Sequence, residues 1–132
     1  MTENLYATVL VVDDFPEWRT RIRETLRRRP EWKIIAEASD GEEAVHKATE
    51  YQPDIILLDI GLPRLNGIEA AKRIRQSSPH HAHIVFVSQE RDTDIRDAAL
   101  SIEGTGYVQK TDAATQLVPA IASVLVDRYS AA

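Results

Sequence analysis

The sequence contains five polar residues, each placed directly after an apolar segment, that together could receive a phosphoryl group: Asp13, Asp14, Asp59, Ser88 and Lys110. Three carboxylates gathered at one point would repel each other by roughly 4 kcal/mol per pair at 4 Å and an effective dielectric near 20. A cation is therefore expected among them, and Mg²⁺ suits hard oxygen ligands, with Mn²⁺ as a substitute. A carboxylate, a divalent cation, an ammonium group and a hydroxyl group can stabilise a phosphoryl group during transfer.

Asp59 is the candidate nucleophile of this set. It follows the aliphatic run 55–58, which predicts a strand buried on both faces, and carboxylates are known to form aspartyl-phosphate intermediates. The alternative is that Asp59 only ends the strand before a loop, which Gly61, Pro63 and Gly67 enforce. The other polar residues at strand ends favour the chemical interpretation.

The elements that must position these residues alternate between strands and helices. Strands are predicted at 7–12, 33–38, 55–58, 84–87 and 107–109, and helices at 16–29, 39–50, 67–77, 92–101 and 112–128. The alternation predicts an α/β fold with a doubly wound, five-stranded parallel sheet and right-handed crossovers. The order 2-1-3-4-5 would bring Asp13, Asp14 and Asp59 together at the switch point between the first and third strands.

Several local signals set the boundaries of the helices. Pro30 is expected to stop the first helix near Arg29, and Ser39 with Glu42 fits a capping box that opens the second. Pro119 predicts an irregular start to the last helix. The helix at 92–101 is sparsely apolar, with Ile95, Ala98, Ala99 and Ile102 expected to face inward, so it should be the least tightly packed helix.

Composition narrows the class of protein. The chain has 132 residues, 43% hydrophobic and 28% charged, which predicts one globular domain spanning 1–132 with a core at about 7–128. No apolar run could span a bilayer, no secretory signal is visible, and the absence of cysteine fits a cytoplasmic location. A net charge of -5 argues against nucleic-acid binding by this segment.

Two clusters of basic residues allow more than one interpretation. Six arginines lie on the first predicted helix, where a solvated face is expected and docking of an acidic partner is the alternative: Arg19, Arg21, Arg23, Arg27, Arg28 and Arg29. Three histidines, His80, His81 and His83, precede the fourth strand and could suggest a metal site. They lack a nearby carboxylate, so we expect surface residues there.

The motifs in their order along the chain resemble the receiver domain of two-component response regulators. They are the acidic pair 13–14, the run Leu-Leu-Asp-Ile-Gly-Leu-Pro with a glycine four residues later, Ser88, and Gly-Tyr-Val-Gln-Lys at 106–110. The resemblance covers residues from about Ala7 to Arg128 and implies a CheY-like, flavodoxin-like fold. Thr111 after Lys110, and the run Leu-Val-Pro-Ala-Ile at 117–121, look like the receivers of LuxR-type regulators.

The resemblance implies a role for each site residue. Asp59 would accept a phosphoryl group from a sensor histidine kinase or a phosphotransfer protein. Mg²⁺ would be held by Asp14, Asp59 and the main-chain carbonyl of Gly61, with Asp13 acting through water.

Lys110 and Ser88 would contact the phosphoryl oxygens, and Tyr107 would be the switch aromatic that remodels a surface, although an ordinary half-buried tyrosine is the alternative. Such a domain assists its own phosphorylation and dephosphorylation without being an enzyme in the usual sense. A homodimer formed on phosphorylation is a further implication.

Two departures from the commonest receiver pattern bear on kinetics. Gln89 stands where a small residue is common and would restrict access to the phosphoryl group, and Gly61 places no side chain beside the site. Three other functions are alternatives: a constitutive interaction module that kept only the fold, an FMN binder with the same strand order, and a small-molecule phosphatase. The acidic loop after the first strand argues against FMN, and so short a chain leaves no cap domain for a phosphatase.

Overall fold

The computed structural model describes residues 6–77 and 81–130, the side chains of 127–130 excepted. Strands and helices alternate along the chain. The strands are β1 (Ala7–Val12), β2 (Trp32–Ala38), β3 (Ile55–Leu58), β4 (His83–Ser88) and β5 (Thr105–Gln109). The helices are α1 (Pro16–Leu26), α2 (Gly41–Tyr51), α3 (Gly67–Ser77), α4 (Thr93–Leu100) and α5 (Ala113–Ser130). In the described residues, no helix combines the length and the apolar character needed to cross a membrane.

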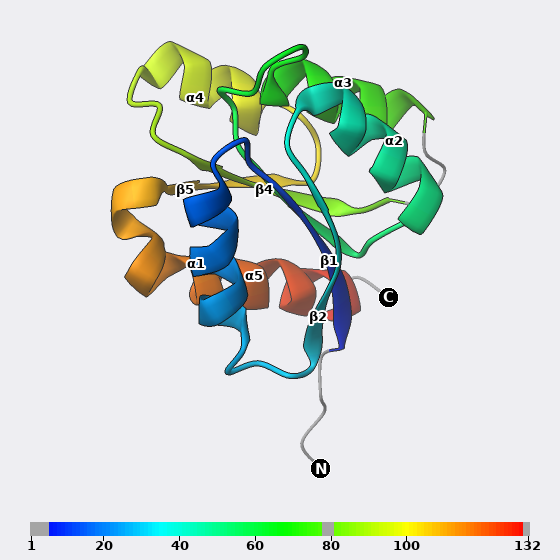
Figure 1. The fold of residues 1–132 in the computed structure, drawn as a ribbon, viewed down its shortest axis with the longest axis vertical. Helices are drawn as coiled ribbons and strands as arrows, with labels where there is room; N and C mark the ends of the chain where they lie inside the picture. The colour runs from blue at the N-terminus through cyan, green and yellow to red at the C-terminus, as the bar shows by residue number, and fades with distance from the viewer. Residues whose placement is uncertain (1–5, 78–80, 131–132) are drawn as a thin grey trace.

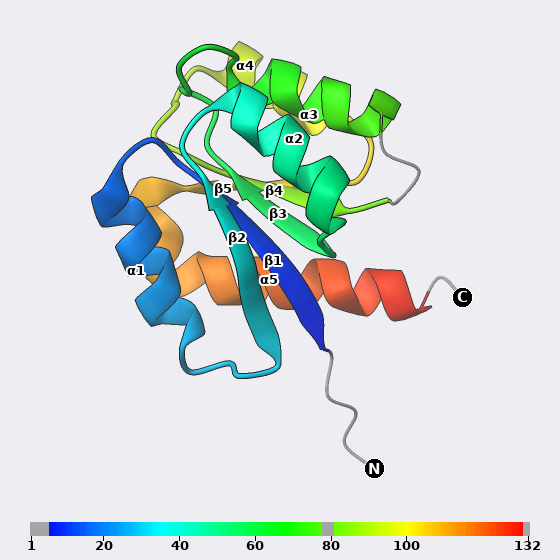
Figure 2. The same cartoon turned by 45° about the vertical axis from the view of Figure 1, so that its right-hand side comes forward.

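The five strands form one parallel sheet in the order β2-β1-β3-β4-β5, which confirms the predicted topology. Helices α1 and α5 cover one face of the sheet, and α2, α3 and α4 cover the other (Figure 1). The turned view shows the sheet running between these two layers (Figure 2). Every strand therefore points its carboxyl end toward the same edge of the sheet, where ligands of such folds bind.

The sheet separates two apolar cores. Alternate residues of a strand point to opposite faces, so Val9 and Val11 of β1 pack with α1 and α5, whereas Leu10 and Val12 pack with the layer on the other side. The four residues of β3 are all at most 1% exposed, as expected for a strand buried on both faces. This central strand delivers Asp59 to the sheet edge.

Two predicted helix boundaries were wrong. Helix α1 ends at Leu26 and not at Arg29, because the three arginines that follow offer no apolar side chain to hold another turn against the core. Helix α2 is capped by Asp40, whose side chain accepts a hydrogen bond from the amide of Glu43 at 2.8 Å. Glu43, and not Glu42, reaches back to the amide of Ser39 at 2.6 Å, so the predicted capping interaction is displaced by one residue.

Helices α4 and α5 follow the predictions in part. Ala99 is the buried residue of α4, as the sparse apolar pattern indicated, but Ala98 is exposed and does not face inward. The last helix is preceded by a 3₁₀ turn at Lys110–Asp112, and α5 then continues through Pro119. This turn directly follows β5 and places Lys110 at the sheet edge.

Candidate functional site

Strands β1 and β3 end side by side at the carboxyl edge of the sheet. Val12 pairs with Leu58 across the two strands, and the amide of Asp59 donates to the carbonyl of Val12 at 3.0 Å. The amide of Asp13 likewise donates to the carbonyl of Ala38 on β2 at 3.0 Å. The residues that follow these strands therefore enter the same space, as the strand order predicted.

Asp13, Asp14 and Asp59 form a compact acidic group. One carboxylate oxygen from each lies within 4.8 Å of those of the other two. The ammonium group of Lys110 lies 2.8 Å from Oδ2 of Asp13 and 3.3 Å from Oδ2 of Asp59. Since Asp13, Asp59 and Lys110 are all buried, this pairing operates where solvent screens charge weakly.

The donor set fits a hard divalent cation. Oδ1 of Asp14 is buried and has no hydrogen-bond partner within the part of the chain that the structure describes. One lysine also leaves three clustered carboxylates with an excess of negative charge. A buried carboxylate oxygen without a partner, beside two further carboxylates, is the arrangement that a magnesium ion would complete.

Burial raises the pKa of the Asp59 carboxyl group above its ordinary value, and the negative charge of Asp13 raises it further. Lys110, by its charge and its hydrogen bond, and the amide of Gly61 act in the opposite direction. Asp59 is thus a carboxylate whose ionised form is held in a poorly solvating environment, which is the usual condition of a reactive group.

Ser88 and Tyr107 are joined to the site through the loop after β4. The hydroxyl of Ser88 accepts a hydrogen bond from the amide of Glu90 at 3.1 Å. The phenol of Tyr107 donates to the carbonyl of Glu90 at 2.9 Å, and the side-chain amide of Gln109 donates to the same oxygen at 2.9 Å. Tyr107 is half-buried, and burial raises the pKa of its phenol, so the hydroxyl remains a donor near neutral pH.

A pocket of about 270 Å³ opens onto this group. It is lined by residues from four loops at the carboxyl edge of the sheet: Phe15, Asp59, Gly61, Ser88, Gln89, Glu90 and Lys110. Asp59 and the hydroxyl of Ser88 therefore face one common space. Gln89 is exposed and lines this pocket, and the restriction of access that its side chain would cause stays a prediction.

Sequence reasoning missed the aromatic surroundings of Lys110. Its ammonium group lies 4.9 Å from the ring centroid of Trp18 and 5.6 Å from that of Phe15. Cation–π attraction helps to hold the lysine over the site. The sequence signal was the presence of two aromatic residues within four positions of the acidic pair, but only the fold brings them to a lysine nearly a hundred positions away.

The histidines before β4 and the arginines of α1 do not form a site comparable to the acidic group in the described part of the chain. Of the histidines, His80 lies outside the described residues, and His81 stands 3.9 Å from a carboxylate oxygen of Glu103. In the ranges the structure describes, only the three aspartates form a group able to hold a metal ion. On α1, Arg19 and Arg23 pair with Glu37 and do not form a simply solvated face.

Comparison with known proteins agrees with this geometry. Residues 9–122 match the family model of the response regulator receiver domain. The nitrate/nitrite response regulator protein NarL of Escherichia coli (strain K12) is 34% identical over 104 residues, which are 79% of this chain and 48% of NarL. The chain thus spans about half the length of that relative.

Solved structures show the same resemblance. A LuxR-family two-component response regulator from Aurantimonas sp. SI85-9A1 has a TM-score of 0.85 at 34% identity, covering 92% of this chain and 86% of that chain. CheY of Borrelia burgdorferi, in a complex with CheX, BeF3 and Mg, has a TM-score of 0.81 at 25% identity, covering 89% and 87%. From the fold, the site and these matches together, the chain belongs to the family of response regulator receiver domains.

Proposed function

We propose that this receiver domain accepts a phosphoryl group on Asp59 in a magnesium-dependent reaction and thereby switches an interaction surface. The observation that carries the proposal is the convergence of Asp13, Asp14, Asp59 and Lys110 at one sheet edge beside Ser88. The donor would be a phosphohistidine on a sensor kinase or a phosphotransfer protein. A cytoplasmic location is part of the proposal, and the absence of cysteine fits it.

In the transfer, a carboxylate oxygen of Asp59 forms a bond to phosphorus while the phosphorus–nitrogen bond of the donor histidine breaks. The electron pair of that bond stays on the imidazole, and Asp59 carries the phosphoryl group as a mixed anhydride. Lys110, already bonded to Asp59, would move its pairing to a phosphoryl oxygen. This step depends on positioning and charge stabilisation more than on proton transfer.

Asp14, Asp59 and the main-chain carbonyl of Gly61 would hold Mg²⁺ directly, and Asp13 would act through water. The ion would supply positive charge to neutralise the phosphoryl oxygens as they approach the acidic group. The similarity to the Borrelia burgdorferi CheY, which is complexed with BeF3 and Mg, supports this assignment. Mn²⁺ should substitute, since it accepts the same oxygen ligands.

The switch would run from Ser88 to Tyr107. A phosphoryl group adds about -1.5 to -2 of charge and strong acceptor oxygens. Ser88 would turn to donate to one of these oxygens and release the amide of Glu90. Because Tyr107 bonds the Glu90 carbonyl and lies 5.5 Å beneath the guanidinium of Arg96 on α4, this movement would reach the surface of α4. The expected consequence of this change is homodimerisation through the surface of α4.

The experiment is incubation with acetyl phosphate and MgCl₂, followed by intact-mass measurement. Wild type should gain one phosphoryl group, whereas Asp59→Asn should gain none and EDTA should abolish the gain. Asp94→Asn, on the exposed first turn of α4, is the matched control and should still be modified. An unmodified wild-type mass would favour the alternative, a constitutive interaction module with this fold.

A further inference from the structure

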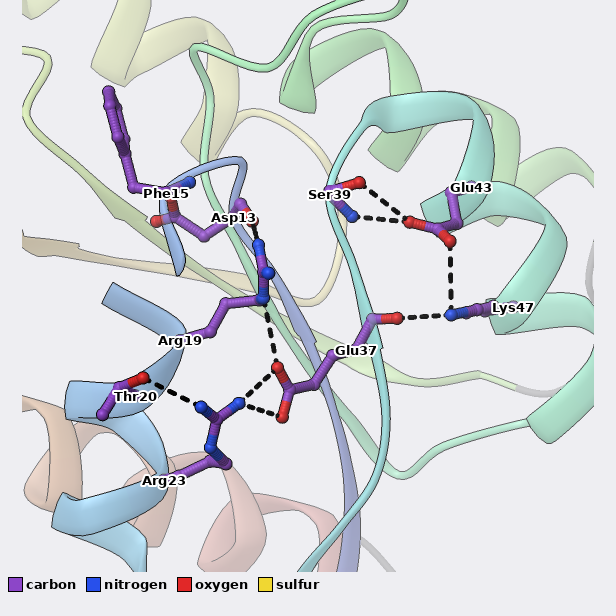
Figure 3. Close-up of polar contacts among 9 residues, drawn as sticks. All are labelled: Asp13, Phe15, Arg19, Thr20, Arg23, Glu37, Ser39, Glu43 and Lys47. Atoms are coloured by element: carbon purple, nitrogen blue, oxygen red, sulfur yellow. Dashed lines mark hydrogen bonds and ion pairs between the residues drawn. The ribbon is translucent and has the colours of Figure 1, made fainter. Parts of the chain in front are cut away.

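The side chain of Arg19 connects the loop that carries Asp13 and Asp14 to strand β2 (Figure 3). Its Nη1 donates to the main-chain carbonyl of Asp13 at 2.6 Å, and its Nε donates to the carboxylate of Glu37 at 3.1 Å. Helical side chains lean toward the amino end of their helix. Arg19 lies in the first turn of α1, so it reaches back to the loop that precedes the helix.

The carbonyl that Arg19 binds belongs to the peptide group linking Asp13 to Asp14. Because a peptide group is planar, fixing its oxygen also fixes the direction in which the chain continues into Asp14. The rest of Asp13 is held from other directions, since its amide donates to Ala38 and its carboxylate accepts from the amide of Phe15 at 2.9 Å. Arg19 therefore sets the orientation of Asp14, whose buried Oδ1 has no hydrogen-bond partner among the described residues.

Glu37, which accepts a hydrogen bond from Arg19, is itself held in place by several contacts. Nη1 of Arg23 lies 2.6 Å from each of its carboxylate oxygens, and Nη2 of Arg23 donates to the hydroxyl of Thr20 at 2.8 Å. Nζ of Lys47 on α2 donates to the main-chain carbonyl of Glu37 at 2.5 Å. Figure 3 shows this chain of contacts running from α1 across β2 to α2. Contacts from α1 and α2 thus fix the position of Glu37 on β2.

Glu37 also compensates the charge of Arg19. An unpaired guanidinium beside the acidic group would compete electrostatically with a divalent cation. The side chains of Arg19 and Glu37 are 21% and 27% exposed, so their charges oppose each other in a partly desolvated setting. Arg19 can therefore donate to the Asp13 carbonyl while Glu37, a carboxylate that it shares with Arg23, compensates part of its positive charge.

We infer that Arg19, supported by Glu37, is a positioning residue for the divalent-cation site. The inference rests on the proposed function and deepens it. Mg²⁺ demands nearly octahedral geometry, and an arrangement of ligands already in place loses less conformational freedom on binding. Arg19 provides this preorganisation through the main chain and does not itself contact the cation.

The test compares Arg19→Gln with Arg23→Gln, which removes the other guanidinium on Glu37 but leaves the Asp13 carbonyl contact in place. Mg²⁺ is titrated into each protein while intrinsic tryptophan fluorescence is followed, in which Trp18, beside Lys110, is expected to report the binding. Arg19→Gln should raise the dissociation constant about tenfold, the lower end for loss of an outer-shell partner. Arg23→Gln should bind Mg²⁺ as wild type does. In metal-free protein, amide exchange at 14–15 should quicken in Arg19→Gln only.

Equal effects of the two substitutions on both measurements, or wild-type behaviour of Arg19→Gln, would overturn the inference while leaving the proposed function intact. Absence of Mg²⁺ binding by wild type would instead remove the proposed function and this inference with it. Should Arg19→Gln fail to fold by circular dichroism, Arg19→Lys takes its place, since it keeps the positive charge but loses the planar fork that reaches the Asp13 carbonyl and Glu37 together. Wild-type affinity in that variant would also contradict the inference.

Discussion

At the scale of single residues, the negative charges of the site are only partly neutralised by the positive charge of Lys110. Asp59 loses solvation on burial and faces the carboxylate of Asp13, and these two effects outweigh the opposing contribution of Lys110 to its pKa. The folded chain therefore binds a proton at Asp59 more readily than the unfolded chain does. By linkage, an ionised Asp59 lowers the stability of the metal-free protein.

The sign of this effect can be measured with Asp59→Asn. The pKa of Asp59 is raised in the folded state above its ordinary value of 3.8. The free energy of unfolding of wild type should therefore increase relative to that of the variant as the pH falls from the raised pKa toward 3.8. At pH 7 in EDTA, Asp59→Asn should resist urea better than wild type, and the advantage should shrink on acidification. Lys110 keeps its 2.8 Å pair with Asp13 in the variant. An advantage independent of pH would contradict the assigned cause.

Asp14 offers a second prediction at this scale. Asp14→Asn removes one charge from the acidic group and breaks no hydrogen bond of the buried Oδ1. It should stabilise the metal-free protein by about 1–2 kcal/mol, less than the roughly 4 kcal/mol of a close charge pair because Asp14 is only partly buried. Urea unfolding in EDTA checks the stability, and a Mg²⁺ titration should show lost affinity. A destabilised variant would show that the carboxylates do not repel each other.

At the scale of elements, the site depends on how closely α3 approaches the end of β3. Gly67 opens α3, and its amide donates to the carbonyl of Ile60 at 2.7 Å. A Cβ atom at Gly67 would overlap the main-chain carbonyl of Asp59. The glycine thus allows a helix to begin directly against the backbone of Asp59.

Gly67→Ala should therefore lower the free energy of unfolding by about 2–3 kcal/mol, the range for forcing extra atoms into a packed site. Gly61→Ala is the matched control in the same loop, because a Cβ there meets no atom within 4 Å. Its stability should stay within about 0.5 kcal/mol of wild type, as for an ordinary surface change. Urea unfolding of both variants is the measurement. Equal stability of the two would show that α3 can retreat from β3 without cost.

At the scale of the whole molecule, the free energy of unfolding should be coupled to binding of a cation at the acidic group. The acidic group joins the ends of β1 and β3 at the centre of the sheet, and Lys110 joins it from the end of β5. A ligand that binds only the folded chain stabilises all of it by mass action. The cation site should accordingly be visible in global unfolding.

Mg²⁺ at ten times its dissociation constant should add roughly 1.4 kcal/mol of stability, which corresponds to a rise in Tm of about 4 °C for a domain of this size. Differential scanning calorimetry with and without MgCl₂ measures the shift, and equal ionic strength of NaCl controls for screening. Asp14→Asn should lose most of the rise. The same rise with NaCl would mean that general screening, not a site, causes it.

The sequence alone determined the topology and the edge of the sheet at which the polar residues gather. The alternation of apolar runs with helical patterns leaves little choice besides a parallel sheet, because right-handed crossovers and buried strands restrict the connections. Polar residues directly after strands must then gather at one edge of the sheet. For this reason the sequence predicts that five residues lie together, and the strand order on which this prediction depends is confirmed: Asp13, Asp14, Asp59, Ser88 and Lys110.

Only the tertiary structure decided how these residues are held. The pairing of Arg19 with Glu37, the rings of Phe15 and Trp18 around Lys110, and the contacts of Tyr107 with Glu90 join residues from different elements. No local pattern encodes such contacts, because they depend on strand register, the tilt of each helix and the rotamers that packing leaves open. The predictions of two helix ends were wrong for a related reason. At 27–29 and at 39–43, the boundary depends on the balance between contacts with the core and competing capping residues.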